Sequence, residues 1–406
     1  MNFSNFNFHP DLFSGIEASN YETATAVQEA VIPPILAGKD IIASAQTGTG
    51  KTAAFLLPVI HRLLSREGTQ KSIRALIIVP TRELAIQISQ HLEGLAYFTS
   101  ISSLAVYGGS EAQNFVGEKK ALQMGADIII CTPGRFISHL NLGYVSLEGL
   151  EFLILDEADR MLDMGFLDDI NRIIAKLPAN RQNLLFSATM PPKIRLLAKN
   201  ILKNPEEINI SISRPPDKIA QKAYVVYELQ KLPVLKHVLA NTVFKSALIF
   251  CSSKKNVKIL TRNLKQEGLK VEEIHSDLLQ SQREDVLNGF TSGRIPVIVA
   301  TDILSRGIDI DTIDLVINYD VPRDGEDYVH RIGRTARAEA EGIAVTFIGE
   351  KEQNRFRAIE NLIKKEVEKM PVPEMLGKTP EYAPGRKRSS SPPQRGKKFY
   401  NYRKKK

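Results

Sequence analysis

One short stretch constrains the fold of this chain more than any other. Residues 45–52 read Ala-Gln-Thr-Gly-Thr-Gly-Lys-Thr; the apolar run Ile41–Ala43 precedes them, and helical apolar spacing follows from Ala53 to Leu64. Glycines let backbone N–H groups close around phosphate oxygens, and a helix N-terminus adds partial positive charge at the same place. The pattern therefore predicts a phosphate-binding loop between a strand and a helix.

Two side chains of this loop have specific roles in that chemistry. Lys51 would reach the outer phosphates of a nucleotide, and Thr52 would offer a hydroxyl to Mg²⁺. Ala45 stands where a glycine is usual, so the stretch taken alone could also be a Gly/Thr-rich turn with a chance lysine. The residues expected around the nucleotide phosphates are Ala45, Gln46, Thr47, Gly48, Thr49, Gly50, Lys51 and Thr52.

The length and composition are those of a globular protein with more than one domain. At 406 residues the chain is long enough for two or three domains, and 43% apolar with 25% charged residues is ordinary for a soluble protein. Cys131 and Cys251 have no Cys or His near them in sequence, which indicates neither a disulfide framework nor a zinc site. No apolar run approaches the roughly 18 residues of a membrane span, and residues 1–9 lack a basic leader. We therefore expect a soluble cytoplasmic protein without a membrane segment.

Two series of short apolar runs alternate with helical patterns, from Asp40 to about Ile210 and from Ala223 to Ile348. This alternation predicts βαβ units, so each series should form a parallel sheet covered by helices on both faces. Ligands of such sheets bind beyond the carboxyl ends of the strands, and in the first series polar clusters follow the apolar runs. We place the two domains at residues 1–212 and 219–369, with a linker at 213–218.

The positive charge of the chain is concentrated at its C-terminal end. The net charge is +8, but residues 378–406 hold eleven Lys/Arg against one acid, a net +10, so the other residues together carry −2. A helix is expected from about Glu350 to Lys369, and from residue 370 onward apolar periodicity vanishes. We therefore predict a disordered basic tail at 370–406, which could tether RNA, keep the protein soluble or act as a targeting signal.

A second cluster matches the phosphate loop. The residues Asp156-Glu157-Ala158-Asp159 follow the apolar run Phe152–Leu155. Phosphoryl transfer needs one carboxylate to hold Mg²⁺ and can use another to accept a proton from the attacking water. The same acids could instead mark an exposed helix start, where carboxylates favour the helix dipole. Their place after a buried run, downstream of a phosphate loop, favours the catalytic interpretation.

These residues belong to a longer series of motifs. In order along the chain, the series comprises residues 45–52, 80–84, 108–109, 132–135, 156–159, 187–189, 280–283, 300–309 and 330–337. With this series the chain resembles the DEAD-box ATP-dependent RNA helicases from Phe3 to Lys369, and it is most similar to their bacterial RhlE-like branch. The resemblance implies an α/β fold with two RecA-like parallel-sheet domains in tandem, a P-loop NTPase of helicase superfamily 2. ATP would lie between the domains and single-stranded RNA across both.

The resemblance also assigns roles at the ATP site. Gln28 would read the adenine edge, Phe3 would stack on the ring, and Asp309 would contact the ribose. Family members usually carry Gly at position 20 and Pro at positions 24 and 26, where this chain has Asn, Ala and Ala. We therefore expect a less rigid loop before Gln28.

For catalysis, the resemblance implies that Lys51 holds the phosphates, Asp156 holds Mg²⁺ and Glu157 is the general base. Arg334 and Arg337 would reach the γ-phosphate from the second domain as arginine fingers. This role suits a guanidinium, because it stabilises transition-state charge and works only when the domains close.

Two further groups of residues are implied to link ATP hydrolysis to RNA. The coupling residues are Asp159, Ser187, Thr189 and His330. The residues implied to contact the RNA backbone are Thr81, Arg82, Gly109, Thr132, Arg135, Arg283, Thr301 and Arg306. Hydroxyls, peptide N–H groups and guanidiniums suit phosphate and 2′-OH oxygens rather than base edges.

Three classes of function compete for this sequence. The first is an RNA-stimulated ATPase that unwinds short RNA duplexes or remodels RNA–protein complexes, with ribosome-assembly or RNA-decay proteins as candidate partners. The second is an ATP-gated RNA-binding clamp, whose signature would be degenerate catalytic residues; Lys51, Asp156 and Glu157 are all present. The third is a DNA helicase, in which Gln28 and the stretch 132–135 would be unexpected. We therefore expect an RNA helicase that uses ATP and Mg²⁺.

Overall fold

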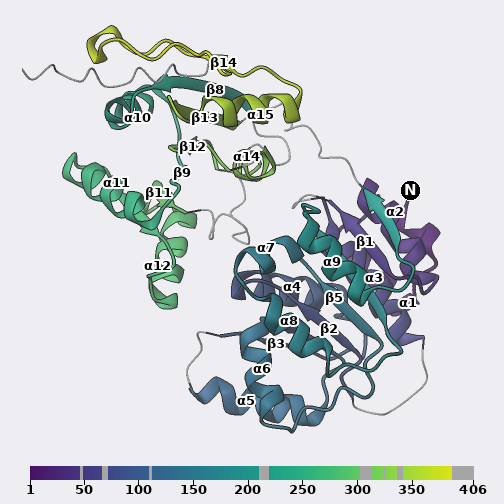
Figure 1. Cartoon of the computed structure of the whole chain (residues 1–406). Coiled ribbons are helices and arrows are strands. Elements are labelled where there is room, and N and C mark those ends of the chain that lie inside the picture. The colour runs from purple at the N-terminus through teal and green to yellow at the C-terminus, as the bar shows by residue number, and fades with distance from the viewer. Residues whose placement is uncertain are drawn as a thin grey trace, which may run out of the picture.

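The protein contains two seven-stranded sheets surrounded by helices (Figure 1). Its computed structural model describes residues 1–45, 49–65, 72–108, 112–209, 219–301, 313–323, 325–335 and 342–385. Within these ranges, every pairing between named strands is parallel. The prediction of two parallel α/β domains in tandem is therefore confirmed. A membrane span needs a long, uniformly apolar helix, and the described residues contain none.

The first sheet has the strand order β3-β4-β2-β5-β6-β1-β7. Inner strands such as β4 and β5 consist entirely of buried residues, because apolar clusters lie on both faces of the sheet. The edge strand β7 has a polar sequence and escaped the apolar pattern. The elements are η1 (Phe3–Phe6), α1 (Pro10–Ala18), α2 (Ala26–Leu36), β1 (Ile41–Ser44), α3 (Lys51–Leu64), β2 (Ala75–Ile78), α4 (Arg82–Leu95), β3 (Ser103–Val106), α5 (Ala112–Met124), β4 (Ile128–Cys131), α6 (Pro133–Asn141), β5 (Phe152–Leu155), α7 (Ala158–Asp163), α8 (Leu167–Ile174), β6 (Gln182–Ser187), α9 (Pro192–Ile201) and β7 (Glu206–Asn209).

The second sheet repeats this plan with the order β10-β11-β9-β12-β13-β8-β14. Counted in chain order, its strands occupy the same relative positions as those of the first sheet, so β8 corresponds to β1 and α10 to α3. The elements are β8 (Ile219–Val226), η2 (Glu228–Gln230), α10 (Lys231–Asn241), β9 (Ala247–Phe250), α11 (Lys254–Gln266), β10 (Val271–Ile274), α12 (Gln280–Thr291), β11 (Val297–Ala300), β12 (Leu315–Asn318), α14 (Gly325–Ile332), β13 (Gly342–Gly349), α15 (Gln353–Ile363), β14 (Glu368–Lys369) and η3 (Glu374–Leu376).

The closing helix is shorter than the apolar spacing predicted. The helix α15 ends at Ile363, because Lys364 adopts the left-handed conformation with φ of 51°. Val367 is still buried, but it lies between this helix and the edge strand β14. The buried apolar residues at helical spacing in this stretch, Phe356, Ile359, Ile363 and Val367, therefore belong in part to α15 and in part to the extended segment that follows it.

The predicted start of the tail at residue 370 was also wrong. The Tyr382 hydroxyl donates a hydrogen bond of 2.6 Å to Glu360 on α15, and the side chain of Gln353 accepts one of 2.9 Å from the backbone N–H of Ala383. These hydrogen bonds hold the segment around Tyr382 and Ala383 against α15, although its sequence has no apolar periodicity. Residues 386–406 lie outside the described residues.

Candidate active site

The described residues of the predicted phosphate loop, Ala45 and Thr49 to Thr52, lie between the end of β1 and the first turn of α3. Gly50 caps α3 in the left-handed conformation, with φ of 88°, and a Cβ there would lie 2.5 Å from the side-chain nitrogen of Gln28. Lys51 is the first residue of α3, is buried, and donates a 2.8 Å hydrogen bond from Nζ to the carbonyl of Ala45. This bond holds the ammonium at the loop, where it would meet phosphate oxygens. Gln46, Thr47 and Gly48 lie outside the described residues.

Gln28 is tied to this loop. Its side-chain carbonyl accepts a 2.8 Å hydrogen bond from the backbone N–H of Thr25, and its amide donates one of 3.2 Å to the carbonyl of Gly50. The Thr25 hydroxyl donates in turn to the carbonyl of Thr49 at 2.8 Å. A glutamine amide has two N–H donors and two acceptor lone pairs, and these bonds use one of each. The remaining pair is what reading an adenine edge requires, and that role stays a prediction.

Phe3 lies in the core of the first domain. Its ring packs against Phe6 at 5.9 Å and edge-on against Tyr21 at 5.7 Å between centroids, and the residue is 1% exposed. Its stacking on adenine, which would require a ring face accessible to the ligand, stays a prediction.

The acidic cluster lies immediately after β5, two strands from β1. Burial raises the pKa of Asp156 to about 6, while the positive charge of Lys51 acts in the opposite direction. Glu157 adopts the left-handed conformation, with φ of 52°, and its carboxylate pairs with Arg160 at 3.0 Å. The predicted Mg²⁺ ligand and general base are thus neighbouring buried carboxylates within the electrostatic reach of the loop lysine.

The residues present fit a magnesium ion. Asp156 is a buried carboxylate whose charge is poorly compensated, and the hydroxyl-bearing Thr52 follows Lys51 at the start of α3. No group of three or more His, Cys, Asp and Glu in the described part of the chain could hold a metal unaided. Magnesium prefers one or two carboxylates together with substrate phosphates and water. Asp156 and Thr52 are the residues that would hold it.

Three predicted coupling residues are joined in the structure. The backbone N–H of Thr189 donates to the Asp159 carboxylate at 3.0 Å, and the Ser187 hydroxyl donates to the Thr189 carbonyl at 2.7 Å. The same hydroxyl accepts a hydrogen bond from the backbone N–H of Asp159 at 3.2 Å. The acidic run and the end of β6 therefore form one hydrogen-bonded unit.

The predicted RNA-contacting residues of the first domain follow β2 and β4, which are paired neighbours. Thr81 caps α4 and Thr132 precedes α6. Arg82 lies 4.9 Å above the Tyr107 ring and donates a 2.9 Å hydrogen bond to Glu284 of α12. The carboxyl ends of adjacent strands thus bring these residues to one edge of the sheet. Gly109 lies outside the described residues.

In the second domain, the predicted RNA-contacting, coupling and catalytic residues lie near the carboxyl ends of the strands, as they do in the first domain. Thr301 directly follows β11, Arg283 lies on α12, and His330 and Arg334 lie on and just after α14. The Thr301 hydroxyl and Arg283 Nε are buried without a hydrogen-bond partner among the described residues. Arg306, Asp309 and Arg337 lie outside the described residues.

Sequence reasoning missed His275. It follows β10 and is 1% exposed; its Nε2 lies 3.4 Å from a carboxylate oxygen of Glu273, and its Nδ1 accepts a 3.2 Å hydrogen bond from the backbone N–H of Asp277. The available signal was its position, because a polar residue directly after a buried strand lies at the ligand-binding edge of such a sheet. His275 therefore lies at the same end of the second sheet as Thr301, because β10 and β11 are parallel neighbours.

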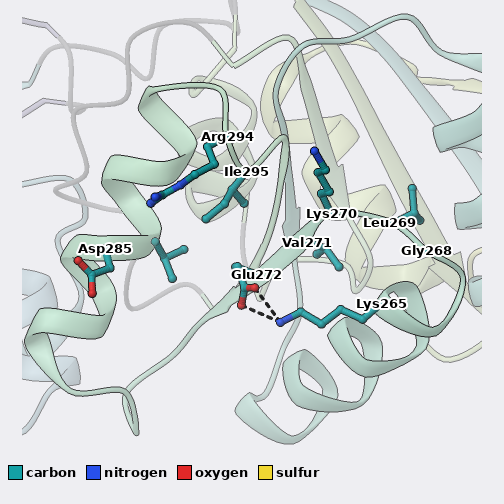
Figure 2. A pocket seen from close by; sticks show the side chains of 10 residues that line it. Lys265, Gly268, Leu269, Lys270, Val271, Glu272, Asp285, Arg294 and Ile295 are labelled. Carbon is teal, nitrogen blue, oxygen red and sulfur yellow. Dashed lines mark hydrogen bonds and ion pairs between the residues drawn. The ribbon is translucent and has the colours of Figure 1, made fainter.

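The second domain also has a surface groove, and it lies apart from the predicted ATP- and RNA-binding residues. It has a volume of about 720 Å³ and lies around the start of β10, between the end of α11 and α12 (Figure 2). Its lining includes Leu269 and Ile295, with the ion pair of Lys265 and Glu272 at its rim. None of the predicted site residues lines it.

These observations define a class. Two parallel-sheet domains share one strand order, and the first carries a phosphate loop with a buried lysine opposite a pair of buried carboxylates. The second presents Thr301, Arg283 and Arg334 from the corresponding elements. This is the architecture of a nucleoside triphosphatase with tandem RecA-like domains.

Comparison with known proteins gives the family. Residues 25–197 match the DEAD/DEAH box helicase family, and residues 230–339 match the helicase conserved C-terminal domain. The chain is 43% identical to the ATP-dependent RNA helicase CshA of Listeria monocytogenes, covering 91% of this chain and 70% of that protein. It is 42% identical to the CshA of Streptococcus pneumoniae, covering 90% and 69%. The chain belongs to the DEAD-box family of ATP-dependent RNA helicases.

A solved relative agrees with this assignment. The structure of Saccharomyces cerevisiae Dbp5 bound to RNA and ADP BeF3 matches with a TM-score of 0.81 and 32% identity. The match covers 91% of this chain and 95% of the Dbp5 chain. The relation therefore extends over both domains.

Proposed function

We propose that this protein hydrolyses ATP in response to RNA and uses domain closure to separate short duplexes or to remodel RNA–protein complexes. The observation that supports the proposal is that Lys51, held at the loop by Ala45, lies within electrostatic reach of the buried Asp156, whose neighbour is the buried Glu157. A clamp that only binds RNA has no need of this complete set.

In the proposed reaction, Asp156 and Thr52 would hold a Mg²⁺ ion, which would supply charge neutralisation at the phosphates. Lys51 orients the outer phosphates, and the Glu157 carboxylate accepts a proton from the attacking water. In this structure Glu157 is paired with Arg160, which fixes the orientation of the carboxylate. Arg334 and Arg337 would act as arginine fingers from the second domain, which makes hydrolysis depend on closure.

RNA contacts are proposed for the residues that follow the strands of both sheets. Thr81, Thr132 and Thr301 offer hydroxyls, and Arg82, Arg135 and Arg283 offer guanidiniums, all suited to phosphate and 2′-OH oxygens. The RNA in the Dbp5 relative supports this reading. Contacts of Gly109 and Arg306 are proposed on the family resemblance alone.

Finer assignments remain proposals. The relatives compared above are named CshA, so the comparisons support the DEAD-box family, and membership of the RhlE-like branch is proposed on the basic tail alone. Action in the cytoplasm, with ribosome-assembly or RNA-decay proteins as partners, is proposed from the family.

The decisive experiment measures phosphate release with RNA, with DNA and with no nucleic acid, alongside separation of a short RNA duplex. We expect RNA to stimulate turnover and DNA to stimulate it weakly. Glu157→Gln should bind ATP and RNA but lose turnover, because it removes the base and leaves the Mg²⁺ site intact. Equal release under all three conditions would refute the proposal, and stimulation without duplex separation would favour the clamp.

A further inference from the structure

A cluster of side chains between α5 and α6 surrounds the predicted RNA contact Arg135. Its other members are Phe115 and Glu118 on α5, His139 on α6 and Tyr144 in the turn that follows. Arg135 Nε donates a 2.8 Å hydrogen bond to the Glu118 carboxylate, and the guanidinium carbon lies 4.6 Å from the Phe115 ring centroid. The guanidinium is therefore held both along its edge and against a flat ring.

The supports of Arg135 are themselves fixed. His139 is fully buried, and its Nε2 lies 2.7 Å from the same Glu118 oxygen that binds Arg135. The ring of His139 stacks on Phe115 with centroids 4.3 Å apart and 10° between the planes, and its Nδ1 contacts the Tyr144 hydroxyl. Glu118 is 8% exposed, so this network is shielded from water.

We propose that Glu118, supported by Phe115 and His139, is a positioning residue that presets the Arg135 guanidinium for the RNA backbone. The inference rests on the proposed RNA contact of Arg135. Because α5 comes after the Gly-Gly stretch 108–109 and α6 begins within the stretch 132–135, the cluster also ties together the helices next to two of the predicted RNA motifs.

Positioning and simple electrostatics make opposite predictions for Glu118. A carboxylate beside Arg135 lowers the local positive potential, so its removal should by charge alone strengthen RNA binding. A free arginine must instead lose its rotamer freedom when it binds a phosphate, and Glu118 has already imposed that order. Positioning therefore predicts weaker RNA binding when the carboxylate is removed.

The test measures the RNA concentration that gives half-maximal ATPase stimulation. Glu118→Ala should raise it about five- to tenfold, while the KM for ATP and kcat at saturating RNA stay unchanged. Glu118→Gln keeps a carbonyl acceptor for Arg135 and should stay within about twofold of the parent protein. Glu93→Ala is the matched control, because it removes an exposed acid bonded to Ser89 on α4 of the same domain and should leave the value unchanged.

Two further variants keep the test decisive. In an Arg135→Ala background, Glu118→Ala should add nothing, because the residue that it positions is gone. Phe115→Leu keeps apolar volume but removes the flat support, and should raise the half-stimulating RNA concentration about twofold or more even if Glu118→Ala does not fold. An unchanged or lower value in Glu118→Ala and Phe115→Leu would overturn the positioning role. No effect of Arg135→Ala itself would instead refute the proposed RNA contact.

Discussion

The carboxylate of Asp159 accepts a 3.0 Å hydrogen bond from the backbone N–H of Thr189, so the end of the acidic run is bound to the loop that follows β6. Its other oxygen accepts a hydrogen bond from the backbone N–H of Arg160 at 3.0 Å. The Ser187 hydroxyl accepts a hydrogen bond from the backbone N–H of Asp159 and donates one to the carbonyl of Thr189. If the coupling role predicted for these residues holds, this unit is the link through which the acidic run would act on residues 187–189.

Removing the hydrogen bonds of Asp159 should reduce RNA duplex separation more than it reduces ATP hydrolysis. Asp159→Ala removes two acceptors of backbone hydrogen bonds, and losing one such charge-assisted bond costs about 1.5–3 kcal/mol. We expect the number of duplexes separated per ATP hydrolysed to fall roughly tenfold. Asp159→Asn retains one acceptor oxygen, so its number of duplexes separated per ATP hydrolysed should lie between those of the parent protein and Asp159→Ala. Parallel measurements of phosphate release and duplex separation check this, and an unchanged ratio in Asp159→Ala would contradict it.

The second prediction concerns nucleotide choice. The described hydrogen bonds leave one N–H and one lone pair of the Gln28 amide available, and these can pair with the donor and acceptor of the adenine edge but not with guanine. A buried amide left unpaired costs about 1–3 kcal/mol, so kcat/KM should favour ATP over GTP by roughly tenfold. Gln28→Ala should erase this preference. Thr25→Ala is the control, because it breaks the helix cap shared with Gln28 but keeps the amide. Equal kcat/KM values for ATP and GTP in the parent protein would show that Gln28 serves only to cap α2 and hold the loop.

The third prediction separates ground-state binding from transition-state stabilisation at Arg334. Arg334→Ala should lower kcat by about 10³ while changing the KM for ATP little, because an arginine finger acts on charge that develops in the transition state. Arg334→Lys keeps the charge without the planar fork and should recover only part of the loss. Steady-state kinetics at saturating RNA provide the measurement. A rise in KM with kcat unchanged would place Arg334 in substrate binding or in the fold.

The sequence predicted the strands well wherever a buried strand is a continuous apolar run, as in Phe152–Leu155. It failed at β7 and β14, because edge strands need no apolar run and are recognised only by their partner. The sequence also predicted which polar residues follow the strands, but it did not predict which side chains from other helices contact those residues. Glu118 is the single acid in the sequence of α5, but its position in the sequence does not reveal its partner, and only the fold brings it to Arg135.

The fourth prediction concerns the second domain, where Lys231 begins α10 as Lys51 begins α3. Lys231 is 2% exposed and binds Asp320, just after β12, at 2.9 Å. An ion pair within the second domain thus occupies the positions that correspond to Lys51 and to Asp156, the acid proposed to hold Mg²⁺ in the first domain. Lys231→Met should destabilise this domain by about 3–5 kcal/mol, because it leaves a buried carboxylate unpaired. Lys236→Met, which removes an exposed partner of Glu267 from the same helix, should cost less than about 1 kcal/mol.

This ion pair should also impose a pH dependence. Burial alone would raise the pKa of Asp320, but the Lys231 ammonium outweighs it and lowers that pKa below its usual value. The pair therefore contributes its full stability above the unfolded-state pKa of about 4 and loses it as the pH falls through the lower folded-state pKa. Urea unfolding monitored by hydrogen exchange at β12 should show acid sensitivity that Asp320→Asn abolishes. Equal acid sensitivity in that variant would assign the effect to other carboxylates.

The last prediction concerns residues 386–406, which hold ten Lys/Arg and no Asp or Glu. We predict that they tether RNA, because flexible basic side chains neutralise phosphates and release counterions, and Phe399, Tyr400 and Tyr402 can stack on bases. The cut must follow Gly385 rather than Met370, since residues 371–385 are bonded to α15 through Gln353 and Glu360.

Truncation after Gly385 should leave RNA-independent ATP hydrolysis and thermal unfolding unchanged. It should raise the RNA concentration for half-stimulation and flatten its salt dependence. Each phosphate neutralised contributes about 0.7 to the slope of log K against log salt, so loss of four contacts should reduce the slope by roughly 3. Truncation after Met370 is the contrasting variant, because it also removes the bonds to α15 and should lower the unfolding temperature. If truncation after Gly385 leaves both the half-stimulating RNA concentration and the salt slope unchanged, the basic tail does not bind RNA and acts as a solubilising or targeting segment.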